Sequence, residues 1–584
     1  IDTGVDLDHP DLVDNIASGG YDYVDNDSDA NPSGPGTYMS HGTHVAGIIA
    51  GMKNDTGMHG VAYNAKILAL RAGNSAGSLS SSHIASSIDR SISQGAKVIN
   101  ASFGGSGFSS TTASKWLAAH NNDIVSVHAA GNDGDANPDF DAILPNEVGY
   151  TALKDTLIAV VATDSNNTIA SYSDRCGVAK NWCMAAPGSS IYSTVDTTDN
   201  TDADSDGYDT LSGTSMAAPH VSGAVAVLRS KWPSKTASQT VSILYDTATD
   251  LGDAGIDVIY GRGLLNLDNA VYAQGALTLR TSSGGSHYLN DSNLSTSSVL
   301  GNALSQSVET AVYDKYKRDY YFNLNNAITM LGSGDTLKEL TFNDSDIEIN
   351  LEPGVKLFSE INKGSVQIQN SYQDMNVSFS LNQNPAKVFA FNNKMHVAGL
   401  SDAYSLYSDL HLSKIKNAKV TNISSNGNTK TSLGVVSGYT DVNSTHAVHG
   451  INASMFTNLT KNLSLTAQMS SLIEDETFLS NYFSGAYQTG AAKTNSVNLI
   501  AKSAINKQLN FTAQYTKGIT HVRTLDNSVI SDFSGINSES YSMSLMGNDV
   551  YAKGDTLFTT FKQPMKVTNG NMTLTTANGL NLDD

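Results

Sequence analysis

Continuous apolar runs recur at intervals through the first part of the chain, and segments with helical periodicity lie between them. A run that is apolar at every position is typical of a strand buried on both faces. Between two of these runs Ile84, Ile88 and Ile92 recur at every fourth position, which predicts a helix. Strands and helices in alternation predict an α/β fold, a parallel sheet with helices on both faces. The apolar runs are AKILALR (65–71), AKVINASFG (96–104), NDIVSVHAAGN (122–132) and LIAVVAT (157–163).

The pattern changes near residue 275, where a stretch rich in Ser, Asn and Gly begins. TLRTSSGGSHYLNDSNLSTSSVLGN is typical of a linker, and LSQSVETAVYDKYKRDYYFNL after it predicts a short helical segment. We therefore expect a first domain over residues 1–272 and a linker with a short helix over residues 273–340.

Over residues 341–584 apolar and polar residues alternate, and polar turns separate the alternating stretches. NLTKNLSLTAQMS (458–470) and AINKQLNFTAQYT (504–516) align with each other, which indicates a weak internal repeat of hairpins. Strands of about ten residues joined by polar turns fit a transmembrane β-barrel. A soluble antiparallel sandwich alternates in the same way, so the pattern leaves both alternatives open. In either case we expect an antiparallel, all-β second domain.

The balance of charge excludes one class of partner. The chain has 35 Lys and Arg residues against 56 Asp and Glu residues, a formal net charge of −21 at pH 7. A nucleic-acid-binding protein needs a basic surplus to neutralise phosphates, so we expect no nucleic-acid partner. No run of about 18 apolar residues is present, so we expect no transmembrane helix.

Four short motifs carry side chains suited to catalysis. IDTGVDLDHPDL places Asp2 before a Gly turn, and SHGTHVAGIIAG places His41 at the start of a helix. HAAGNDG places Asn132 after a buried strand, and SGTSMAAPHVSGAVAVL places Ser215 at the tight entry to an apolar helix. A helix N-terminus offers free N–H groups and a partial positive charge to a substrate that becomes negative. Taken alone, Ser215 could equally be a helix N-cap, and Asp2 and Asn132 could be turn residues.

In the chain order Asp, His, Asn, Ser, these motifs resemble the subtilisin family of serine proteases (subtilases, peptidase family S8) over about residues 1–270. The resemblance implies a catalytic triad in which Ser215 attacks a peptide carbonyl, His41 takes the serine proton, and Asp2 orients His41. It also implies that the Asn132 side chain and the Ser215 backbone N–H stabilise the oxyanion. Four matches in the correct order are not explained by unrelated turns and caps.

The other histidines near these motifs have alternative roles. His44 belongs to the same motif as His41 and could be the base instead. The family pattern assigns the first histidine, so we expect His44 to be structural. We expect His128 and His220 to be packed or capping histidines.

SFGG follows a buried strand and resembles the substrate-binding segment of the family. We expect Ser102, Phe103 and Gly104 to pair with an extended peptide, because glycine allows a close approach of two backbones. The alternative for this segment is an ordinary βα turn. Ala130 and Gly131 are expected to line the pocket for the residue before the scissile bond. This small, uncharged lining suggests a preference for apolar side chains.

The resemblance implies no cofactor for catalysis but allows a structural calcium ion. Asp11 and Asn54 stand where relatives have calcium ligands, and carboxylate and amide oxygens suit that ion. The acidic stretch DTTDNTDADSDGYDT resembles the start of an EF-hand loop but has no Glu at its twelfth position, so we expect a solvated acidic loop. Its EF-hand-like residues are Asp202, Asp204, Asp206 and Gly207.

Two cysteines are present in the whole chain, Cys176 and Cys183 in DRCGVAKNWCMAAPG. A single close pair in a large chain fits one disulfide in an exported protein, and the alternative is two unpaired thiols. We expect the disulfide.

CGVAKNWCMAAPG, VYDKYKRDYYFNL and the region from YSMSLMGNDVYAKG onward resemble the autotransporter-type subtilases of Gram-negative bacteria. That resemblance implies a C-terminal β-barrel in the outer membrane and an extracellular or cell-surface location. The chain starts without Met inside a motif and stops without a terminal aromatic strand, so we expect both ends to be incomplete.

The expected protein is therefore an exported serine endopeptidase that acts on protein or peptide substrates and is anchored or secreted by its C-terminal β domain. One alternative is a secreted protease with a soluble binding domain at its C-terminus. Another is a non-catalytic adhesion protein on a protease scaffold. The intact set of Asp2, His41, Asn132 and Ser215 argues against the adhesion protein, which has no need for all four.

Overall fold

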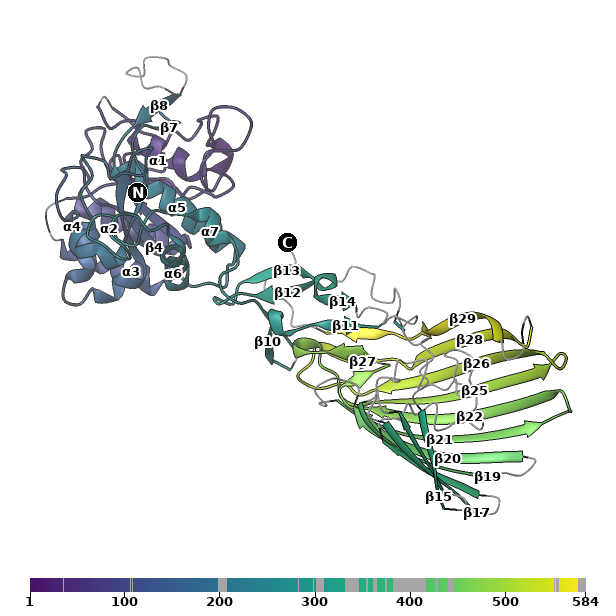
Figure 1. Cartoon of the computed structure of the whole chain (residues 1–584). Helices are drawn as coiled ribbons and strands as arrows, with labels where there is room; N and C mark the ends of the chain where they lie inside the picture. Colours follow the sequence, from purple (N-terminus) through teal and green to yellow (C-terminus); the bar gives the residue numbers. More distant parts are fainter. Residues whose placement is uncertain are drawn as a thin grey trace. The chain divides into compact units, whose positions relative to one another are not determined.

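The chain folds as two units, one from Ile1 to Ala273 and one from Gln274 onward (Figure 1). The sequence places the boundary after residue 272, and the structure divides the chain after Ala273. The computed structural model describes residues 1–34, 36–105, 107, 109–197, 207–281, 283–297, 299–300, 309–330, 346–352, 355–360, 365–372, 375–381, 416–425, 429–439, 446–479, 481–550, 552 and 556–575.

A four-stranded parallel sheet forms the centre of the first unit. The strands of this unit are β1 (Tyr21–Asp22), β2 (Leu70–Arg71), β3 (Val98–Ala101), β4 (Val125–Ala129), β5 (Leu157–Thr163), β6 (Cys183–Pro187), β7 (Ile191–Thr194) and β8 (Tyr208–Leu211). The parallel sheet has the order β3-β4-β5-β6, and β4 and β5 are buried along their whole length, as the apolar runs predict. The run AKILALR forms only the short strand β2, because its partners are the equally short β1 and a single bridge from Ile67 to Ile16.

Helices cover the parallel sheet. They are α1 (His41–Ala50), α2 (Ser81–Ser93), α3 (Ser110–Asn121), α4 (Phe140–Ile143), α5 (Thr214–Lys231), α6 (Ala237–Thr247) and α7 (Leu267–Val271). Ile88 of α2 and Trp116 of α3 share one buried core with strand residues such as Ile99 and Leu157. α5 packs against all four strands, and α1 packs against α5, which confirms a parallel sheet covered by helices (Figure 1). In the described part of the chain, no helix is both long enough and apolar enough to cross a membrane.

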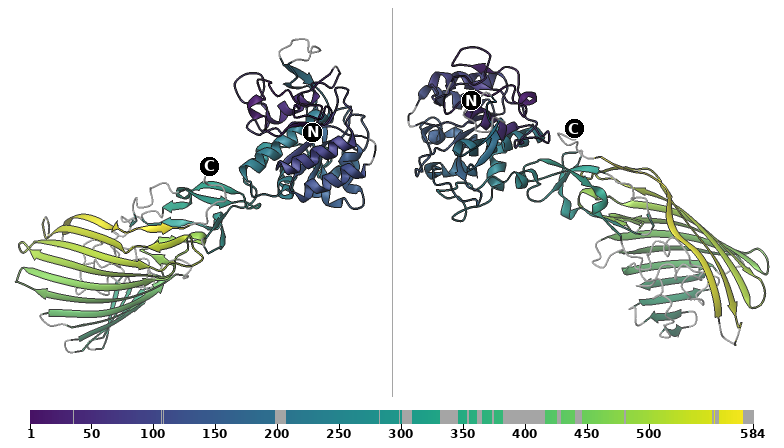
Figure 2. Two further views of the ribbon diagram at one scale, coloured as in Figure 1. Left: turned by 180° about the vertical axis from the view of Figure 1, so that it is seen from behind. Right: turned by 90° about the horizontal axis from the view of Figure 1, so that it is seen from above.

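One large antiparallel sheet dominates the second unit (Figure 2). In sheet order its strands are β15 (Asp346–Glu352), β16 (Val355–Glu360), β17 (Ser365–Tyr372), β18 (Met375–Leu381), β19 (Lys416–Ser425), β20 (Thr429–Tyr439), β21 (Ala447–Asn458), β22 (Leu463–Glu474), β25 (Ala492–Ala504), β26 (Leu509–Val522), β28 (Ile536–Asn548) and β29 (Thr556–Asn569). Within the described ranges no pairing joins the edge strands β15 and β29, so the sheet is antiparallel as expected but is not seen to close.

On this sheet apolar side chains are exposed and polar side chains are buried, which is the reverse of the usual arrangement in a soluble sheet. In β20, Leu433 is 60% exposed while its neighbour Ser432 is 6% exposed. In β22, Met469 is 65% exposed while its neighbour Ser470 is 7% exposed. Other exposed apolar side chains of the sheet are Val377, Phe379, Ile423, Val435, Ile451, Met455, Val497, Leu499, Tyr515, Ile519, Met543 and Leu557. Buried polar side chains include Ser380, Asn452, Ser454, Gln468, Thr494, Asn498, Gln514, Thr516 and Ser540.

The segment expected to be a linker with a short helix is folded as strands. Its strands are β9 (Thr278–Arg280), β10 (Ser286–Tyr288), β11 (Leu294–Thr296), β12 (Glu309–Tyr313), β13 (Asp319–Asn323) and β14 (Ile328–Met330); later short strands are β23 (Thr477–Phe478), β24 (Asn481–Phe483), β27 (Ile530–Phe533) and β30 (Met572–Leu574). β12 and β13 pair antiparallel where a helix is predicted over 304–324, and residues 304–308 lie outside the described ranges. Val312 is buried with Leu279 and Leu324, so the packing of β-branched and aromatic side chains outweighs the local helical periodicity.

Candidate active site

Asp2 and His41 are brought together from two different segments of the first unit. His41 is the first residue of α1, and its Nδ1 lies 2.7 Å from Asp2 Oδ1. The Asp2 backbone is fixed, because its N–H donates to the Leu70 carbonyl and its own carbonyl accepts from the Ala72 N–H. The side chains of Asp2 and His41 are 10% and 14% exposed. When Nδ1–H donates to this carboxylate, Nε2 carries the lone pair that can accept a proton.

Burial opposes the charge on both members of this pair, and their mutual attraction outweighs it. Burial raises the pKa of the Asp2 carboxyl, but the charge and hydrogen bond of His41 and the N–H of Thr3 hold that pKa below its ordinary value of 3.8. Burial lowers the pKa of the His41 imidazole, but the charge and hydrogen bond of Asp2 raise it above its ordinary value of 6.5. His41 is therefore a stronger base than a free histidine.

Ser215 lies in the first turn of α5. Gly213 is the N-cap of this helix and has no capping side chain, so the alternative that Ser215 is the N-cap is wrong. The Ser215 hydroxyl donates to the Ser102 carbonyl at 3.1 Å, and the Ser102 hydroxyl donates to the Ser215 carbonyl at 2.8 Å. Among the described residues the structure therefore joins Asp2 to His41, whereas the Ser215 hydroxyl is bonded to Ser102 and not to His41. Catalytic hydrogen bonds are often looser before substrate binds.

Asn132 is fixed by Thr214, the first residue of α5. Asn132 Oδ1 accepts from the Thr214 N–H at 2.9 Å and lies 3.1 Å from Thr214 Oγ1. Thr214 Oγ1 also accepts from the Gly131 N–H at 3.2 Å. Because Oδ1 is occupied, Asn132 Nδ2 is the side-chain group left to donate to a substrate, and a β-carbon on Gly213 would lie 3.6 Å from it. The sequence analysis misses Thr214, whose one signal is its place beside Ser215.

The segment after β3, residues 102–104, forms one wall beside Ser215. Ser102 is buried, and its Oγ accepts from Asn100 Nδ2 at 2.9 Å while it donates to Ser215. Phe103 packs against the core of the parallel sheet, so its side chain supports the wall from behind. Gly104 is exposed. The part of this segment that is free to pair with a peptide is therefore its backbone and not the Phe103 ring.

The segment after β4 forms a second wall, and a carboxylate that the sequence analysis misses lies against both. The Ala130 carbonyl accepts from the Asp139 N–H at 2.7 Å. A β-carbon on Gly131 would lie 3.1 Å from Asp139 Oδ2, and one on Gly104 would overlap Asp139. Burial raises the pKa of Asp139, and the neighbouring carboxylates, first that of Asp174, raise it further. The lining expected to be uncharged therefore includes a carboxylate.

The remaining histidines of the motifs are held in structural positions. His44 Nε2 bonds backbone carbonyls of β7 and β8, and burial lowers its pKa to about 4. His128 is fully buried in β4 with its ring centroid 4.5 Å from that of Trp116, and burial lowers its pKa to about 3. His220 Nδ1 lies 2.8 Å from a carbonyl one turn earlier in α5. Among the described residues none of these three imidazole rings hydrogen-bonds to Asp2, whose Oδ1 is bonded to His41 Nδ1.

Asp11 and Asn54 are in contact, but as a hydrogen-bonded pair. Asn54 Nδ2 donates to Asp11 Oδ1 at 2.9 Å, and the Tyr208 hydroxyl donates to Asp11 Oδ2 at 2.7 Å. Calcium needs several oxygen atoms turned toward one point, and here an amide N–H and a hydroxyl proton occupy the carboxylate. Among the described residues no group of three or more His, Cys, Asp or Glu is placed to hold a metal. The acidic loop residues Asp202, Asp204 and Asp206 lie outside the described ranges.

The structure pairs Cys176 with Cys183 in a disulfide bond. Both residues are fully buried, and they enclose the 3₁₀ segment Gly177–Trp182 that leads into β6. The Cys183 carbonyl accepts from the Arg262 N–H at 2.8 Å, so the bridge also supports a later loop.

Comparison with known proteins identifies the family of the first unit. The sequence profile of the subtilase family matches residues 1–263. Subtilisin DY of Bacillus licheniformis is 41% identical over 270 residues, which are 46% of this chain and 88% of that protein. Thermitase of Thermoactinomyces vulgaris is 38% identical over 272 residues, 46% of this chain and 86% of thermitase. The halolysin-like extracellular serine protease Nep of Natrialba magadii is 37% identical over 267 residues, 45% of each chain. Through its first unit, the chain therefore belongs to the subtilase family.

Proposed function

We propose that the first unit is a serine endopeptidase that hydrolyses peptide bonds of proteins through Asp2, His41 and Ser215. The observation that carries this proposal is the buried contact of 2.7 Å between His41 Nδ1 and Asp2 Oδ1. Family membership supports the reaction class, because the curated relatives include subtilisins and a serine protease. An adhesion protein gains nothing from an imidazole held by a buried carboxylate, so this alternative ranks second.

The three side chains divide the chemistry between them. His41 Nε2 removes the Ser215 proton while Oγ attacks the peptide carbonyl carbon, and the carbonyl electron pair moves to oxygen. The Asp2 carboxylate stabilises the imidazolium that forms. His41 then gives its proton to the amide nitrogen as the C–N bond breaks, which leaves an acyl ester on Ser215. Water activated by His41 hydrolyses this ester and restores the serine hydroxyl.

Two donors at the entry to α5 would stabilise the oxyanion. Asn132 Nδ2 and the Ser215 backbone N–H both lie at the positive end of the helix, and Thr214 holds the Asn132 amide in place. Donors that are fixed before the reaction need no reorganisation when the negative charge develops. Loss of the Asn132 amide is expected to lower turnover roughly 10²–10³-fold.

The test is labelling of the whole chain with a fluorophosphonate probe, which reacts with an activated serine. The parent should be labelled, and Ser215→Ala should not. Ser212→Ala is the matched control, because Ser212 is an exposed serine at the entry to the same helix. Absence of labelling in a parent with native circular dichroism would overturn the proposal and favour the adhesion protein.

We infer that the second unit places its large sheet in a lipid bilayer, so that it anchors or exports the protease at an outer membrane. The inverted polarity of the sheet supports this, because membrane strands turn apolar side chains to lipid and polar ones inward. β20 has 11 residues and β26 has 14, enough for the about 9–11 residues of a tilted membrane strand. Closure into a barrel would pair the edges of β15 and β29, which cannot stay open in lipid.

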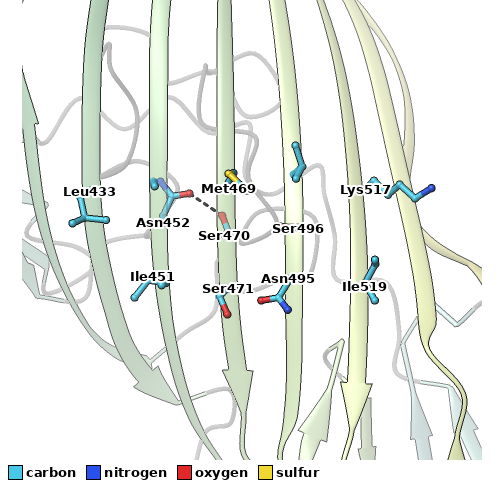
Figure 3. Close-up of a pocket in the computed structure, with 12 residues that line it drawn as sticks. Leu433, Ile451, Asn452, Met469, Ser470, Ser471, Asn495, Ser496, Lys517 and Ile519 are labelled. Carbon is cyan, nitrogen blue, oxygen red and sulfur yellow. Dashed lines mark hydrogen bonds between the residues drawn. The ribbon is translucent and has the colours of Figure 1, made fainter.

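The exposed apolar face argues against a soluble sandwich. A sandwich buries its apolar face against a second sheet, whereas Leu433 and Met469 are more than half exposed. A hollow of about 490 Å³ lies on the sheet, and its lining includes the apolar side chains of Ile451, Met469 and Ile519 beside polar residues (Figure 3). An acyl chain has the chemistry to fill such a hollow. The relative described as extracellular supports an extracellular location for the protease unit.

Flotation of the whole chain with phosphatidylcholine vesicles tests this inference. Met469→Lys puts a charge on the outward face of β22 and should reduce the floating fraction, because a lysine at mid-bilayer costs about 2–4 kcal/mol. Leu459→Lys is the matched control, because Leu459 is 57% exposed but lies in the turn between β21 and β22. A parent that stays with the soluble fraction would instead support the soluble binding domain.

A further inference from the structure

The peptide-binding walls of the first unit are both attached to the nucleophile. The wall after β3 is attached through Ser102, whose hydroxyl donates to the Ser215 carbonyl at 2.8 Å. The wall after β4 is attached through Asn132 and Gly131, which both bond Thr214. A peptide side chain next to the carbonyl under attack must therefore lie between these two walls.

The Asp139 side chain lies between the same two walls. A β-carbon on Gly104 of the first wall would overlap its carboxyl group. One on Gly131 of the second wall would overlap the Asp174 carboxylate and lie 3.1 Å from Asp139 Oδ2, so both carboxylates border this wall. The backbone around Asp139 is fixed to both sides: its N–H donates to the Ala130 carbonyl, and the next N–H, of Phe140, donates to the Gly105 carbonyl at 3.1 Å. Asp139 is the N-cap of α4, but its side chain makes no capping hydrogen bond.

The negative charge at this position has no local compensation. Among the described residues no hydrogen bond or ion pair to the Asp139 carboxylate is present, and the charges that act on it are those of Asp174, Asp133 and Asp135. Arg175, the residue after Asp174, donates instead to the carbonyls of its own loop. An apolar substrate side chain packed here would bury the carboxylate further without a partner, which is unfavourable.

We propose that Asp139 selects a lysine or arginine as the substrate residue before the scissile bond, a specificity that rests on the endopeptidase function proposed above. A cation on a side chain four or five bonds long reaches the carboxylate between the walls and supplies the missing partner. This replaces the apolar preference that Ala130 and Gly131 alone suggest. The neighbouring carboxylates add to the attraction, because they raise the negative potential at the same place.

The experiment compares two chromogenic tetrapeptides, Ala-Ala-Pro-Lys and Ala-Ala-Pro-Leu p-nitroanilide, with the whole chain. The parent should have the higher kcat/KM for the lysine peptide. Asp139→Asn keeps the shape of the side chain and removes its charge, and it should lower the ratio of lysine to leucine kcat/KM roughly ten- to a hundredfold. Most of this loss should be in KM, because the contact is made in the bound state as well as in the transition state.

Asp141→Asn is the matched control, because Asp141 is a second partly buried aspartate on α4. It should change the ratio less than threefold, since no wall glycine contacts it. The inference is overturned if the parent is labelled by the fluorophosphonate but prefers the leucine peptide, and if Asp139→Asn leaves the ratio of lysine to leucine kcat/KM unchanged. That outcome leaves the endopeptidase function intact. A parent that is not labelled and cleaves neither peptide would overturn the endopeptidase itself.

Discussion

Ser102 and Ser215 hold each other by a reciprocal pair of hydrogen bonds, in which each hydroxyl donates to the backbone carbonyl of the other residue. The pair joins the end of β3 to the first turn of α5, and Asn100 and Ser222 extend it into the core. The segment after β3 and the N-terminus of α5 are therefore joined directly through these two serines. Thr214 makes the corresponding connection to the wall after β4, so both walls are hydrogen-bonded to the first turn of α5.

Thr214→Val should lower kcat about tenfold and change KM less than twofold. The substitution keeps the shape of the side chain and removes the hydroxyl that contacts Gly131 and Asn132. The Asn132 amide then has fewer fixed contacts, and a looser oxyanion donor lowers stabilisation of the transition state more than substrate binding. Steady-state kinetics on a chromogenic peptide measure both constants.

Thr214→Ser is the control for this prediction. It keeps the hydroxyl and loses the methyl group, so kcat should stay close to that of the parent. If the serine and valine variants lose the same activity, Thr214 acts through packing and the positioning role is refuted.

The activity should rise with pH along a limb whose midpoint lies above 6.5. His41 must be neutral to take the Ser215 proton, and the Asp2 carboxylate raises the pKa of His41 above that value. Activity is therefore lost as pH falls through the raised pKa. A profile of kcat/KM against pH from about 5 to 9 measures the midpoint for the free enzyme.

Asp2→Asn should move the midpoint of this limb to lower pH. The change removes the negative charge that raises the pKa of His41 and leaves the burial that lowers it. It also disturbs the tautomer of His41, so kcat should fall by several orders of magnitude. An unshifted midpoint in the residual activity would show that the limb belongs to another group.

The candidate catalytic residues could be proposed from the sequence because they stand in four short motifs whose chain order resembles that of the subtilase family. In the structure His41 and Ser215 lie in the first turns of α1 and α5, Asn132 follows β4, and Asp2 forms an isolated bridge with Arg71. The buried runs also predict the central strands correctly, because a strand covered on both faces has no polar position.

Other features depend on contacts that a local pattern does not contain. Asp139 and Thr214 gain their roles only when α4 and α5 meet the ends of β3 and β4. The helix expected over 304–324 fails for the same reason, because pairing with neighbouring strands and burial of Val312 decide the conformation. Apolar and polar residues alternate along the strands of the large sheet in the same way as in a soluble sheet. The sequence alone therefore leaves open both the transmembrane barrel and the soluble sandwich.

Cys176→Ala with Cys183→Ala should lower the free energy of unfolding of the first unit by about 2–3 kcal/mol, the value for a short closed loop. The bridge spans a sequence separation of 7 and supports both β6 and the loop at Arg262. The three tryptophans of the chain all lie in the first unit, so their fluorescence during urea unfolding reports this unit alone.

The parent in a strong thiol reductant is the control for the cysteine pair. It should unfold at the same urea concentration as the double variant once the bond is reduced. Equal midpoints for the oxidised parent and the double variant would mean that the bridge adds no stability.

His128→Phe should make the stability of the first unit less dependent on pH. His128 has no hydrogen-bond partner for either ring nitrogen among the described residues, and burial lowers its pKa to about 3. As pH falls below about 6.5 the unfolded chain binds a proton that the folded chain does not bind, which lowers the free energy of unfolding by about 1.4 kcal/mol per pH unit.

Phenylalanine at position 128 keeps the aromatic contact with Trp116 and removes the titrating group. Urea unfolding followed by tryptophan fluorescence at pH 6 and pH 4.5 should therefore show a loss of stability about 2 kcal/mol smaller in the variant than in the parent. His59→Phe, at an exposed position in the same unit, is the matched control. An equal loss in the His128 variant and the parent would show that His128 is not the group responsible.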